Sequence, residues 1–461
     1  MSLARRSLPV LAALVAAVTL PDVPPGLNVV LSAGLLGIGV LAFTRHPLRG
    51  WNAAMAVASG ALIVMFVLRA AEWVLAVDFL AASALGCLVV GDTSTWRATA
   101  GSFVRALGFL PGARDVLRAP FDGTQKPSRS SLGPAARATG LTVCLLFVFG
   151  ALFASADVAF AQLTSDLLVP DWELGLLPAR VVMFLMVVAV AGGYVAVSRK
   201  GAAVLTSPWR LERRAVQRTE WAVPLAALDV LFVAFVVVQI SVLFGGRTYV
   251  LETAGVSYAE YARQGFFQLI AAGGLTLAVT AAAVAWARPE GKDRKLIQIL
   301  LGILCGCALI ILWSALKRLG LYEDAYGLTR LRITAHATIL WMGAAFVAVG
   351  VAGVIWKASW LPRVVVTVSV VALLVFNLAD PDARIARSNL ALAERTGKLD
   401  VSYLSGLSAD AVPVLVARGC ILEDLRRELS EERSLLSFNL SVERARHALN
   451  AASTSPLGCV P

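Results

Sequence analysis

The sequence predicts an all-α, polytopic membrane protein with about 11 transmembrane helices, on three observations. Of its 461 residues, 58% are hydrophobic and 15% are charged, whereas soluble domains are about half apolar and a quarter charged. The apolar residues occur in long blocks, and about 20 consecutive apolar residues cross the bilayer core as a helix. The net charge of +11 therefore concerns membrane topology and anionic lipid, and we expect no nucleic-acid partner.

The predicted spans follow from the apolar blocks. They lie near residues 8–20, 27–43, 51–69, 72–90, 138–160, 178–198, 222–245, 264–287, 296–316, 334–356 and 362–379. The first block is short, and Arg5 and Arg6 before an apolar centre also fit a signal peptide, which would leave about 10 spans. No clean small-x-small cleavage site precedes Pro21, so we interpret this block as a span.

The orientation follows from the distribution of Lys and Arg, because cytoplasmic loops carry an excess of both. With the N-terminus in the cytoplasm, roughly 23 of these residues fall in inner segments and 8 in short outer loops. The sequence thus predicts a cytoplasmic N-terminus and an extracytoplasmic C-terminus.

Four regions are predicted from these spans. They are a four-span bundle (1–91), a cytoplasmic segment (92–137), a seven-span membrane core (138–379) and an extracytoplasmic helical tail (380–461). In the cytoplasmic segment, TWRATAGSFVRALGFL has apolar residues at helical spacing, which predicts an amphipathic helix on the membrane surface. The Ser-, Pro- and Gly-rich stretch after it is typical of a flexible linker.

The tail is predicted to contain short helices. Gly397 and Gly406 interrupt the helical pattern, and Ser408 or Asp410 is a candidate cap for the next helix. Residues 421–449 predict one longer helix.

The six cysteines fall into two classes. Cys420 and Cys459 lie in the predicted outer tail and are candidates for a disulfide that closes a loop of about 39 residues; two unpaired thiols are the alternative. The other four lie in apolar spans and are interpreted as small packing residues: Cys87, Cys144, Cys305 and Cys307.

The segment LKRLGLYEDAYGLTRLR (316–332) places six formal charges between two apolar blocks. In the predicted topology it faces outward, where its cations are unfavourable and need compensation. Pairing of Arg330 and Arg332 with Glu323 and Asp324 is the simplest compensation.

Two tyrosines give this segment a second interpretation. Tyr322 and Tyr326 are four residues apart and share one face of a helical turn, which Gly327 is expected to end. The segment is therefore either a salt-bridged interfacial loop or a polar site for an anionic or hydroxylated ligand.

The segment GVSYAEYAR is the second outer candidate. Ser257 and Glu260 fit a capping box for the helix that follows, and that structural role would explain both residues. Tyr258, Tyr261 and Arg263 would remain as ligand contacts, because Arg binds phosphate or carboxylate in a bidentate manner and Tyr stacks or hydrogen-bonds. With Glu260, they suit a lipid phosphate or sugar-phosphate head group.

Polar residues inside the spans are a third signal. Asp78 and Asp229 are acids within apolar blocks, and Gln239 lies further along the same block as Asp229. A charge near the bilayer centre costs about 2.5–3.5 kcal/mol on insertion scales, so these acids should face the bundle interior. They form either an ion-coupled path or hydrogen-bonded packing contacts.

Several motifs together resemble a bacterial integral-membrane family catalogued as domain of unknown function 4153 or 4173. The similarity covers roughly residues 40 to 420 and implies a multi-span bacterial membrane protein of the inner membrane without a settled activity. The motifs are ERRAVQRTEWAVPLAALDVLFVAFVVVQ, GVSYAEYARQGFFQL, LYEDAYGLTRLR, NLADPDARIARSNL and LDVSYLSGLSADAVPVL. Beyond the outer-loop candidates, the motif positions include Thr329, Asp382, Asn389 and Asp410.

The leading hypothesis is a transporter-like or flippase-like protein with an outward Tyr/Arg/Glu site for an anionic lipid or envelope substrate. The alternatives are a membrane-embedded enzyme on a lipid-linked substrate, with Glu260, Glu323 or Asp324 as acid or base, and a sensor or assembly scaffold. Membrane lipids, including anionic head groups, are the expected partners, and the tail is a candidate surface for a protein partner.

No cofactor or metal is predicted. The three histidines, His46, His336 and His447, are far apart in sequence, and HExxH, GxSxG, P-loop and CxxC patterns are absent. Only His336, near the acids of the 316–332 segment, gives weak support for an oxygen-rich metal site.

Overall fold

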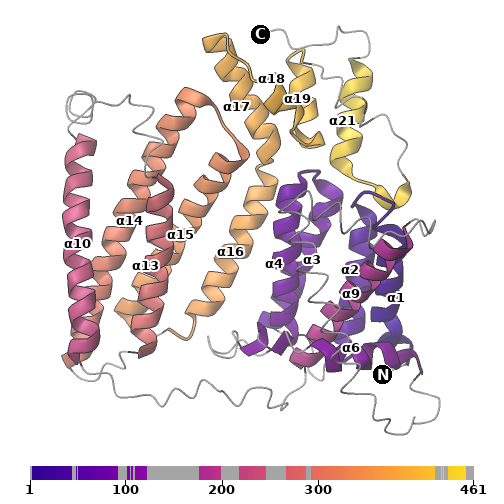
Figure 1. The fold of residues 1–461 in the computed structure, drawn as a ribbon, viewed down its shortest axis with the longest axis horizontal. Coiled ribbons are helices and arrows are strands. Elements are labelled where there is room, and N and C mark those ends of the chain that lie inside the picture. The colour runs from indigo at the N-terminus through magenta and orange to yellow at the C-terminus, as the bar shows by residue number, and fades with distance from the viewer. Residues whose placement is uncertain are drawn as a thin grey trace, which may run out of the picture.

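A computed structural model gives the fold of the chain (Figure 1). It describes residues 3–43, 48, 50–91, 101–103, 105–106, 109–121, 176–198, 218–244, 266–286, 292–356, 358–420, 427, 429 and 434–452. All regular elements within these ranges are helices, which confirms the all-α fold class.

Ten helices correspond to predicted spans, and the block at 138–160 lies outside the described residues. The helices are α1 (Leu3–Thr19), α2 (Leu27–Leu41), α3 (Trp51–Leu68), α4 (Glu72–Val90), α9 (Leu177–Ser198), α10 (Arg218–Phe244), α13 (Phe266–Trp286), α14 (Lys292–Tyr326), α15 (Arg330–Ile355) and α16 (Leu361–Leu378). In the described part of the chain, α3, α4, α9, α14, α15 and α16 are long and apolar enough to cross a membrane. The chain is thus a helical membrane protein, while the exact number of spans stays a prediction.

The helices form two groups joined through α16 (Figure 1). One group contains α1–α4 and α9, and the other contains α10, α13, α14 and α15, whose shared core includes Val236, Leu312 and Phe346. Helix α9, which the sequence places in the membrane core, packs against α1, α2 and α4. Helix α16 packs against α3 and α4 on one side and α15 on the other.

A helix along one end of the bundle corresponds to the predicted cytoplasmic segment. This helix, α6 (Phe109–Arg118), lies across the lower end in Figure 1, further along the chain than most of the predicted amphipathic stretch. It crosses α9 closely because Gly112 and Gly192 have no side chains: a Cβ on Gly112 would lie 2.0 Å from the Gly192 carbonyl oxygen. The predicted linker after it lies outside the described residues.

From α1 to α4, and again from α9 to α16, successive helices of the bundle run in opposite directions (Figure 1). The start of α1 lies at the lower end of the bundle, and the C-terminal helices lie at the upper end (Figure 1). An ion pair between Arg180 and Asp22 joins two segments at the upper end, and Arg218 and Asp293 form one at the lower end with an N–O distance of 3.3 Å. Which end faces the cytoplasm stays a prediction.

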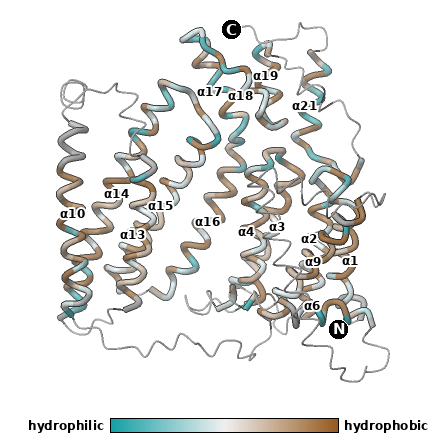
Figure 2. The backbone as a smooth tube through the Cα atoms, in the orientation of Figure 1, coloured by the Kyte–Doolittle hydropathy of each residue, from teal (hydrophilic) through white to brown (hydrophobic). Residues whose placement is uncertain are grey.

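The C-terminal unit consists of short helices above the bundle. They are α17 (Pro381–Thr396), α18 (Val401–Ser405), η2 (Ala409–Ala411), α19 (Val412–Ala417), η3 (Leu435–Ser437) and α21 (Leu440–Ala451). Gly397 ends α17 with a φ of +68°, and Gly406 follows α18, as the sequence predicts. Figure 2 shows that this unit is more hydrophilic than the helices below it.

The prediction of one helix over residues 421–449 is wrong. Asn439 is extended, with φ −143° and ψ 121°, and its side chain accepts hydrogen bonds from the Ser441 and Val442 amides. This N-cap starts α21 anew, while Ser434 caps the preceding turn, η3. Ser and Asn side chains compete with helical backbone bonds in this way, and the apolar periodicity does not reveal it.

The core of the C-terminal unit includes residues of the bundle. Leu328, from the turn between α14 and α15, and Ile333, from the first turn of α15, are buried with Ile385, Leu404 and Leu415. Trp73 of α4 and Phe376 of α16 pack against the same cluster. The unit is therefore docked on the upper end through shared apolar packing as well as polar contacts.

Candidate functional site

The first candidate site, the segment 316–332, spans the end of α14, a short turn and the start of α15. Tyr322 and Tyr326 lie on α14 with their ring centroids 5.0 Å apart. The Arg332 guanidinium lies 4.1 Å from the Tyr322 centroid and donates hydrogen bonds to the carbonyls of Tyr326 and Gly327. Gly327, with a φ of +75°, ends the helix. Arg332 is thus held by a ring and by helix-end carbonyls, for which a cation is a favourable partner.

The expected pairing of the arginines with Glu323 and Asp324 is corrected by the structure. Arg330 instead forms a bidentate pair with Asp382, with Nη2–Oδ2 at 2.7 Å and Nε–Oδ1 at 3.1 Å. Glu323 lies 2.9 Å from Nδ1 of His336. The first turn of α15 is compensated by an acid 52 residues away, a contact that spacing within the segment does not reveal.

Asp382 is the most enclosed acid of this region, because its side chain is 0% exposed. Besides Arg330, the Trp73 indole donates to Oδ1 at 3.1 Å and the Ser408 amide donates to Oδ2 at 2.9 Å. Burial by itself raises the pKa of the carboxyl, but the hydrogen bonds from Arg330 and Ser408 and the Arg330 charge outweigh it and hold the pKa below 3.8. The ionised Asp382 thus ties α4, α15 and the C-terminal unit together.

The short turn between α14 and α15 is held by the C-terminal unit. The Asn389 side chain accepts from the Leu328 amide at 2.7 Å and donates to the Leu328 carbonyl at 2.9 Å. The Tyr403 hydroxyl accepts from the Arg330 amide at 2.8 Å. Of the motif positions, Asp382 and Asn389 therefore have one structural task in common, which is to fix this turn.

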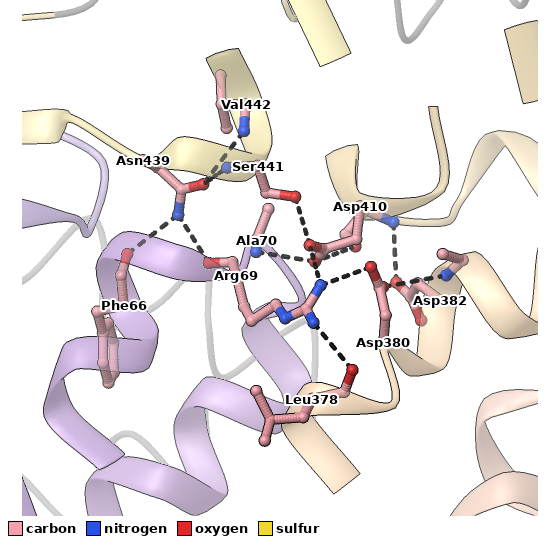
Figure 3. A network of polar contacts seen from close by, with 12 residues as sticks. Phe66, Arg69, Ala70, Leu378, Asp380, Asp382, Asp410, Asn439, Ser441 and Val442 are labelled. Carbon is pink, nitrogen blue, oxygen red and sulfur yellow. Dashed lines mark hydrogen bonds and ion pairs between the residues drawn. The ribbon is translucent and has the colours of Figure 1, made fainter. Parts of the chain in front are cut away.

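A second polar network lies where the turn between α3 and α4 meets the C-terminal unit (Figure 3). Arg69 forms an ion pair with Asp380 at 2.5 Å, lies 3.7 Å from Oδ1 of Asp410 and donates to the Leu378 carbonyl. Burial and the neighbouring Asp410 raise the pKa of Asp380, although Arg69 opposes this. The Ala70 amide donates to Asp410 at 2.8 Å.

Two residues at the start of α21 complete this network. The Asn439 side chain donates to the carbonyls of Phe66 and Arg69, at 3.0 and 2.7 Å, and so satisfies the C-terminal end of α3. The Ser441 hydroxyl donates to Asp410. The network therefore joins four elements that are distant in sequence.

A polar cavity of about 410 Å³ lies beside both networks. It is lined by Pro24, Pro25, Ala70, Glu72, Trp73, Leu75, Arg330, Ser405, Gly406, Leu407, Ser408, Ala409, Leu429, Asn439 and Val442. Glu72 and Arg330 are the charged side chains among them. Glu72 is exposed at the start of α4, and the Arg330 side chain is 36% exposed despite its pairing with Asp382. The volume of the cavity is within the range of small-molecule sites, which is about 300–1,000 Å³.

The other predicted binding residues are either undescribed or absent from the cavity lining. Tyr258, Glu260, Tyr261 and Arg263 fall outside the described residues. Tyr322, Glu323, Asp324, Tyr326 and Arg332 are described but do not line the cavity. Among the described members of the predicted binding set, Arg330 alone lines the cavity.

The two acids within the membrane-spanning helices face the bundle interior, as expected. Asp78 of α4 is fully buried and accepts a hydrogen bond from the Asn377 side chain of α16 at 3.0 Å. Asp229 of α10 is buried, and neither of its carboxylate oxygens has a hydrogen-bond partner among the described residues. The Gln239 side chain lies outside them. Asp78 thus joins α4 to α16, which agrees with the packing alternative.

The cysteines agree with the two expected classes as far as they are described. Cys87, Cys305 and Cys307 are free and buried in helices. Cys420 is buried and disulfide-bonded. Cys459 and Cys144 lie outside the described residues, so the pairing of Cys420 with Cys459 stays a prediction.

Residues 56–417 match the family model DUF4153, a domain of unknown function. The chain belongs to this family. The resemblance inferred from the motifs is thereby confirmed, and the match extends over most of the sequence. No curated protein and no solved structure matches this chain.

The DUF4153 match also divides the polar networks. Arg69, Arg330, Asp380, Asp382 and Asp410 lie within it. Asn439 and Ser441, which complete the network around α3, come from beyond its C-terminal limit. The DUF4153 region thus carries the ion pairs, and the segment after it adds neutral hydrogen bonds.

Sequence reasoning did not identify Arg69, Glu72, Trp73 or Asp380 as members of a site. Arg69 was evident as a cation in an outer loop, and Asp380 as part of the DPD sequence where the apolar blocks end. Both signals lie next to span ends. The missing information was which span ends meet, because that depends on packing between distant helices.

Proposed function

We propose that this DUF4153 protein is a transporter-like or flippase-like protein of the bacterial inner membrane that binds an amphipathic envelope substrate. The polar part of the substrate occupies the polar cavity, between the ends of α2 and α4 and the loop at residues 405–409. The observation that carries the proposal is the cavity itself, which combines two charged side chains with Trp73 at the upper end of apolar helices. Binding sites in membrane proteins are commonly built from convergent polar groups at helix ends.

The position of the cavity is consistent with an outward-facing site. The cavity lies at the end of the bundle that carries the C-terminal unit, opposite to the start of α1 (Figure 1). The distribution of Lys and Arg predicts that this end is extracytoplasmic. A substrate would therefore reach the cavity from the outer leaflet or from the space beyond it.

The charge of the cavity argues against a purely anionic substrate. Arg330 has its charge compensated by buried Asp382, and Glu72 adds an acid to the wall. An anionic head group alone would gain little from Arg330 and would be repelled by Glu72. The anionic substrate expected from the loop arginines is thus replaced by one with both a cationic and an anionic or hydroxylated group.

The test is a comparison of Glu72→Gln with Asp324→Asn. Both remove one exposed carboxylate at the upper end, but only Glu72 lines the cavity. The full chain, extracted with its native lipid, is analysed for co-purifying lipid by mass spectrometry. We expect Glu72→Gln to lower the retained lipid about tenfold, which corresponds to about 1.4 kcal/mol, and Asp324→Asn to leave it unchanged.

Reconstituted vesicles test the transport part of the proposal. Movement of a fluorescent phospholipid between leaflets should depend on the protein and fall in Glu72→Gln. Equal lipid retention in both variants and no protein-dependent movement would contradict the proposal.

A scaffold is the second candidate because one apolar surface of the C-terminal unit is open. Leu435 of η3 is 86% exposed, and Phe438 beside it is 41% exposed. Single exposed apolar residues are common, but a pair on one turn is a candidate contact for a membrane surface or a protein partner. Retained lipid exchange in Leu435→Ser, together with loss of a co-purifying protein, would favour this candidate.

A further inference from the structure

An apolar groove lies below the polar cavity, within the membrane-spanning part of the bundle. It has a volume of about 380 Å³ and is formed by α2, α3, α4 and α9. Its walls are almost entirely apolar, and Ser59, Ser83 and Tyr194 are the polar side chains among the lining residues. The Ser59 and Tyr194 hydroxyls donate to backbone carbonyls of α4, so their hydrogen-bonding needs are met within the protein.

We infer that this groove holds one acyl chain of a glycerophospholipid whose zwitterionic head group occupies the polar cavity. The acyl-chain part of the inference rests on the groove alone. The head-group part rests on the proposed function.

Glycines keep the groove open. Gly34 and Gly37 of α2 and Gly60 of α3 line it, and a Cβ on any of them would meet no atom of the described residues within 4 Å. Small residues in membrane helices usually permit close helix contact, as Gly112 and Gly192 do where α6 crosses α9. These three positions are exposed, so a side chain added at any of them would extend into the groove and its opening rather than against a neighbouring helix.

The mouth of the groove opens toward lipid. Ile38, Val64 and Phe79 line the groove and are 56%, 41% and 42% exposed. They lie on helices that are apolar over most of their length, and α3 and α4 are long enough to cross the membrane. The medium around these side chains is therefore the acyl region of the bilayer. A lipid acyl chain can enter the groove from there without passing through water.

The groove and the polar cavity follow one another along α4. Leu75 lines the cavity, and Phe79, one helical turn below, lines the groove. Four residues correspond to about 6 Å along a helix axis. The same order holds at the start of α2, because Pro25, just before the helix, lines the cavity and Val30, within it, lines the groove. A molecule that fills both sites therefore has a polar end and an adjoining long apolar end.

The two charged side chains of the cavity select the head group. Glu72 and Arg330 have opposite charges and are close enough to interact electrostatically. A head group with an ammonium and a phosphate complements both, with the ammonium near Glu72 and the phosphate near the exposed part of Arg330. Trp73 also lines the cavity, and the Arg330 guanidinium lies 5.9 Å from the centroid of its ring.

The experiment fills the groove and counts bound lipid. The double variant Gly37→Leu/Gly60→Leu places two leucines into open space in the groove. The matched control is Gly302→Leu on α14, where a Cβ also meets no atom within 4 Å and which does not line the groove. Each full chain is purified in mild detergent with an equal mixture of phosphatidylethanolamine and phosphatidylglycerol, and native mass spectrometry measures the bound lipid.

We expect the wild type and Gly302→Leu to retain one phosphatidylethanolamine, and the double variant to lose at least about nine-tenths of it. Unchanged lipid in a folded double variant would overturn the groove assignment, and preferential retention of phosphatidylglycerol would overturn the zwitterionic head group. If the double variant loses lipid while Glu72→Gln retains it, the groove assignment holds and the proposed function fails. Loss in Glu72→Gln alone overturns the groove assignment and leaves the proposed function intact.

Discussion

At the scale of single residues, the upper end of the protein depends on acids that are bonded rather than free. Asp382 accepts hydrogen bonds from an arginine, an indole and a backbone amide, all from different elements. Asp380 and Asp410 are likewise bonded within the protein, since both form ion pairs with Arg69. Because these carboxylates are occupied by protein donors, they hold the structure together, and the ligand-facing charges are those of Glu72 and the exposed part of Arg330.

The first prediction concerns Asp382. Replacing it by Ala leaves Arg330, the Trp73 indole and the Ser408 amide without their acceptor, and each buried donor left unsatisfied costs about 1–3 kcal/mol. We expect a strong loss of folded protein and a lower melting temperature in detergent. Since the pKa of Asp382 lies below 3.8, its stabilisation is complete above that pH and is lost as the pH falls through the lowered value.

Glu394→Ala is the control for Asp382→Ala. The Glu394 side chain pairs with Arg418 on the surface, where both are more than half exposed, and exposed pairs contribute about 0–1 kcal/mol. A similar melting temperature for both variants would contradict the structural role assigned to Asp382. By the same reasoning, Arg330→Ala should lower the amount of folded protein and so cannot report on ligand binding by itself.

At the scale of elements, the turn between α14 and α15 shows how the C-terminal unit controls a membrane helix. Gly327 has a positive φ. The backbone amide and carbonyl of Leu328 are not bonded within a helix; the Asn389 side chain of α17 accepts from the amide and donates to the carbonyl. The turn is thus fixed from outside the helix pair.

The second prediction tests this turn with Gly327→Ala. The left-handed backbone costs a residue with a Cβ about 1–2 kcal/mol, and the new Cβ would lie 2.4 Å from Oδ1 of Asn389. We expect a lower melting temperature and faster proteolysis of α17. In Gly320→Ala, within α14 and with no atom within 4 Å of a Cβ, helix propensity predicts a gain of up to about 1 kcal/mol; equal effects of the two variants would refute the explanation.

At the scale of the whole molecule, the two ends of the bundle differ. The lower end carries the start of α1 and the surface helix α6, and the upper end carries the C-terminal unit, the polar cavity and both ion-pair networks (Figure 1). This asymmetry is what a protein with a substrate site on one side of the membrane requires. The proposed function therefore depends on which end faces outward.

The third prediction is the orientation of these ends. A cysteine introduced at Ala325 is exposed near the upper end of α14, and one at Ala358 is exposed in the turn between α15 and α16 at the lower end. In intact cells, an impermeant thiol reagent should label Ala325→Cys at once and Ala358→Cys only after lysis. The reverse pattern would place the cavity in the cytoplasm and remove the basis for an outward site.

Much of the fold could be predicted because hydropathy is a local property. An apolar block such as 51–69 is recognised from consecutive residues, and α3 lies where that block predicts it. The segment 421–449 shows the limit of this reasoning, because the Asn439 cap interrupts an otherwise helical pattern. The site was less predictable, since Arg330 was identified as a candidate but assigned to acids on its own segment.

The sequence by itself determined that this is a helical membrane protein of the DUF4153 family, and it located the helices, because bilayer insertion depends on runs of apolar residues. Only the tertiary structure decided which polar residues meet. Arg69 and Asp380 are 311 residues apart. They meet because α3, α4 and α16 pack side by side, so that the turn between α3 and α4 lies next to the C-terminal end of α16. The cavity and the groove have the same origin, since both are spaces between helices whose neighbours are chosen by packing rather than by order in the chain.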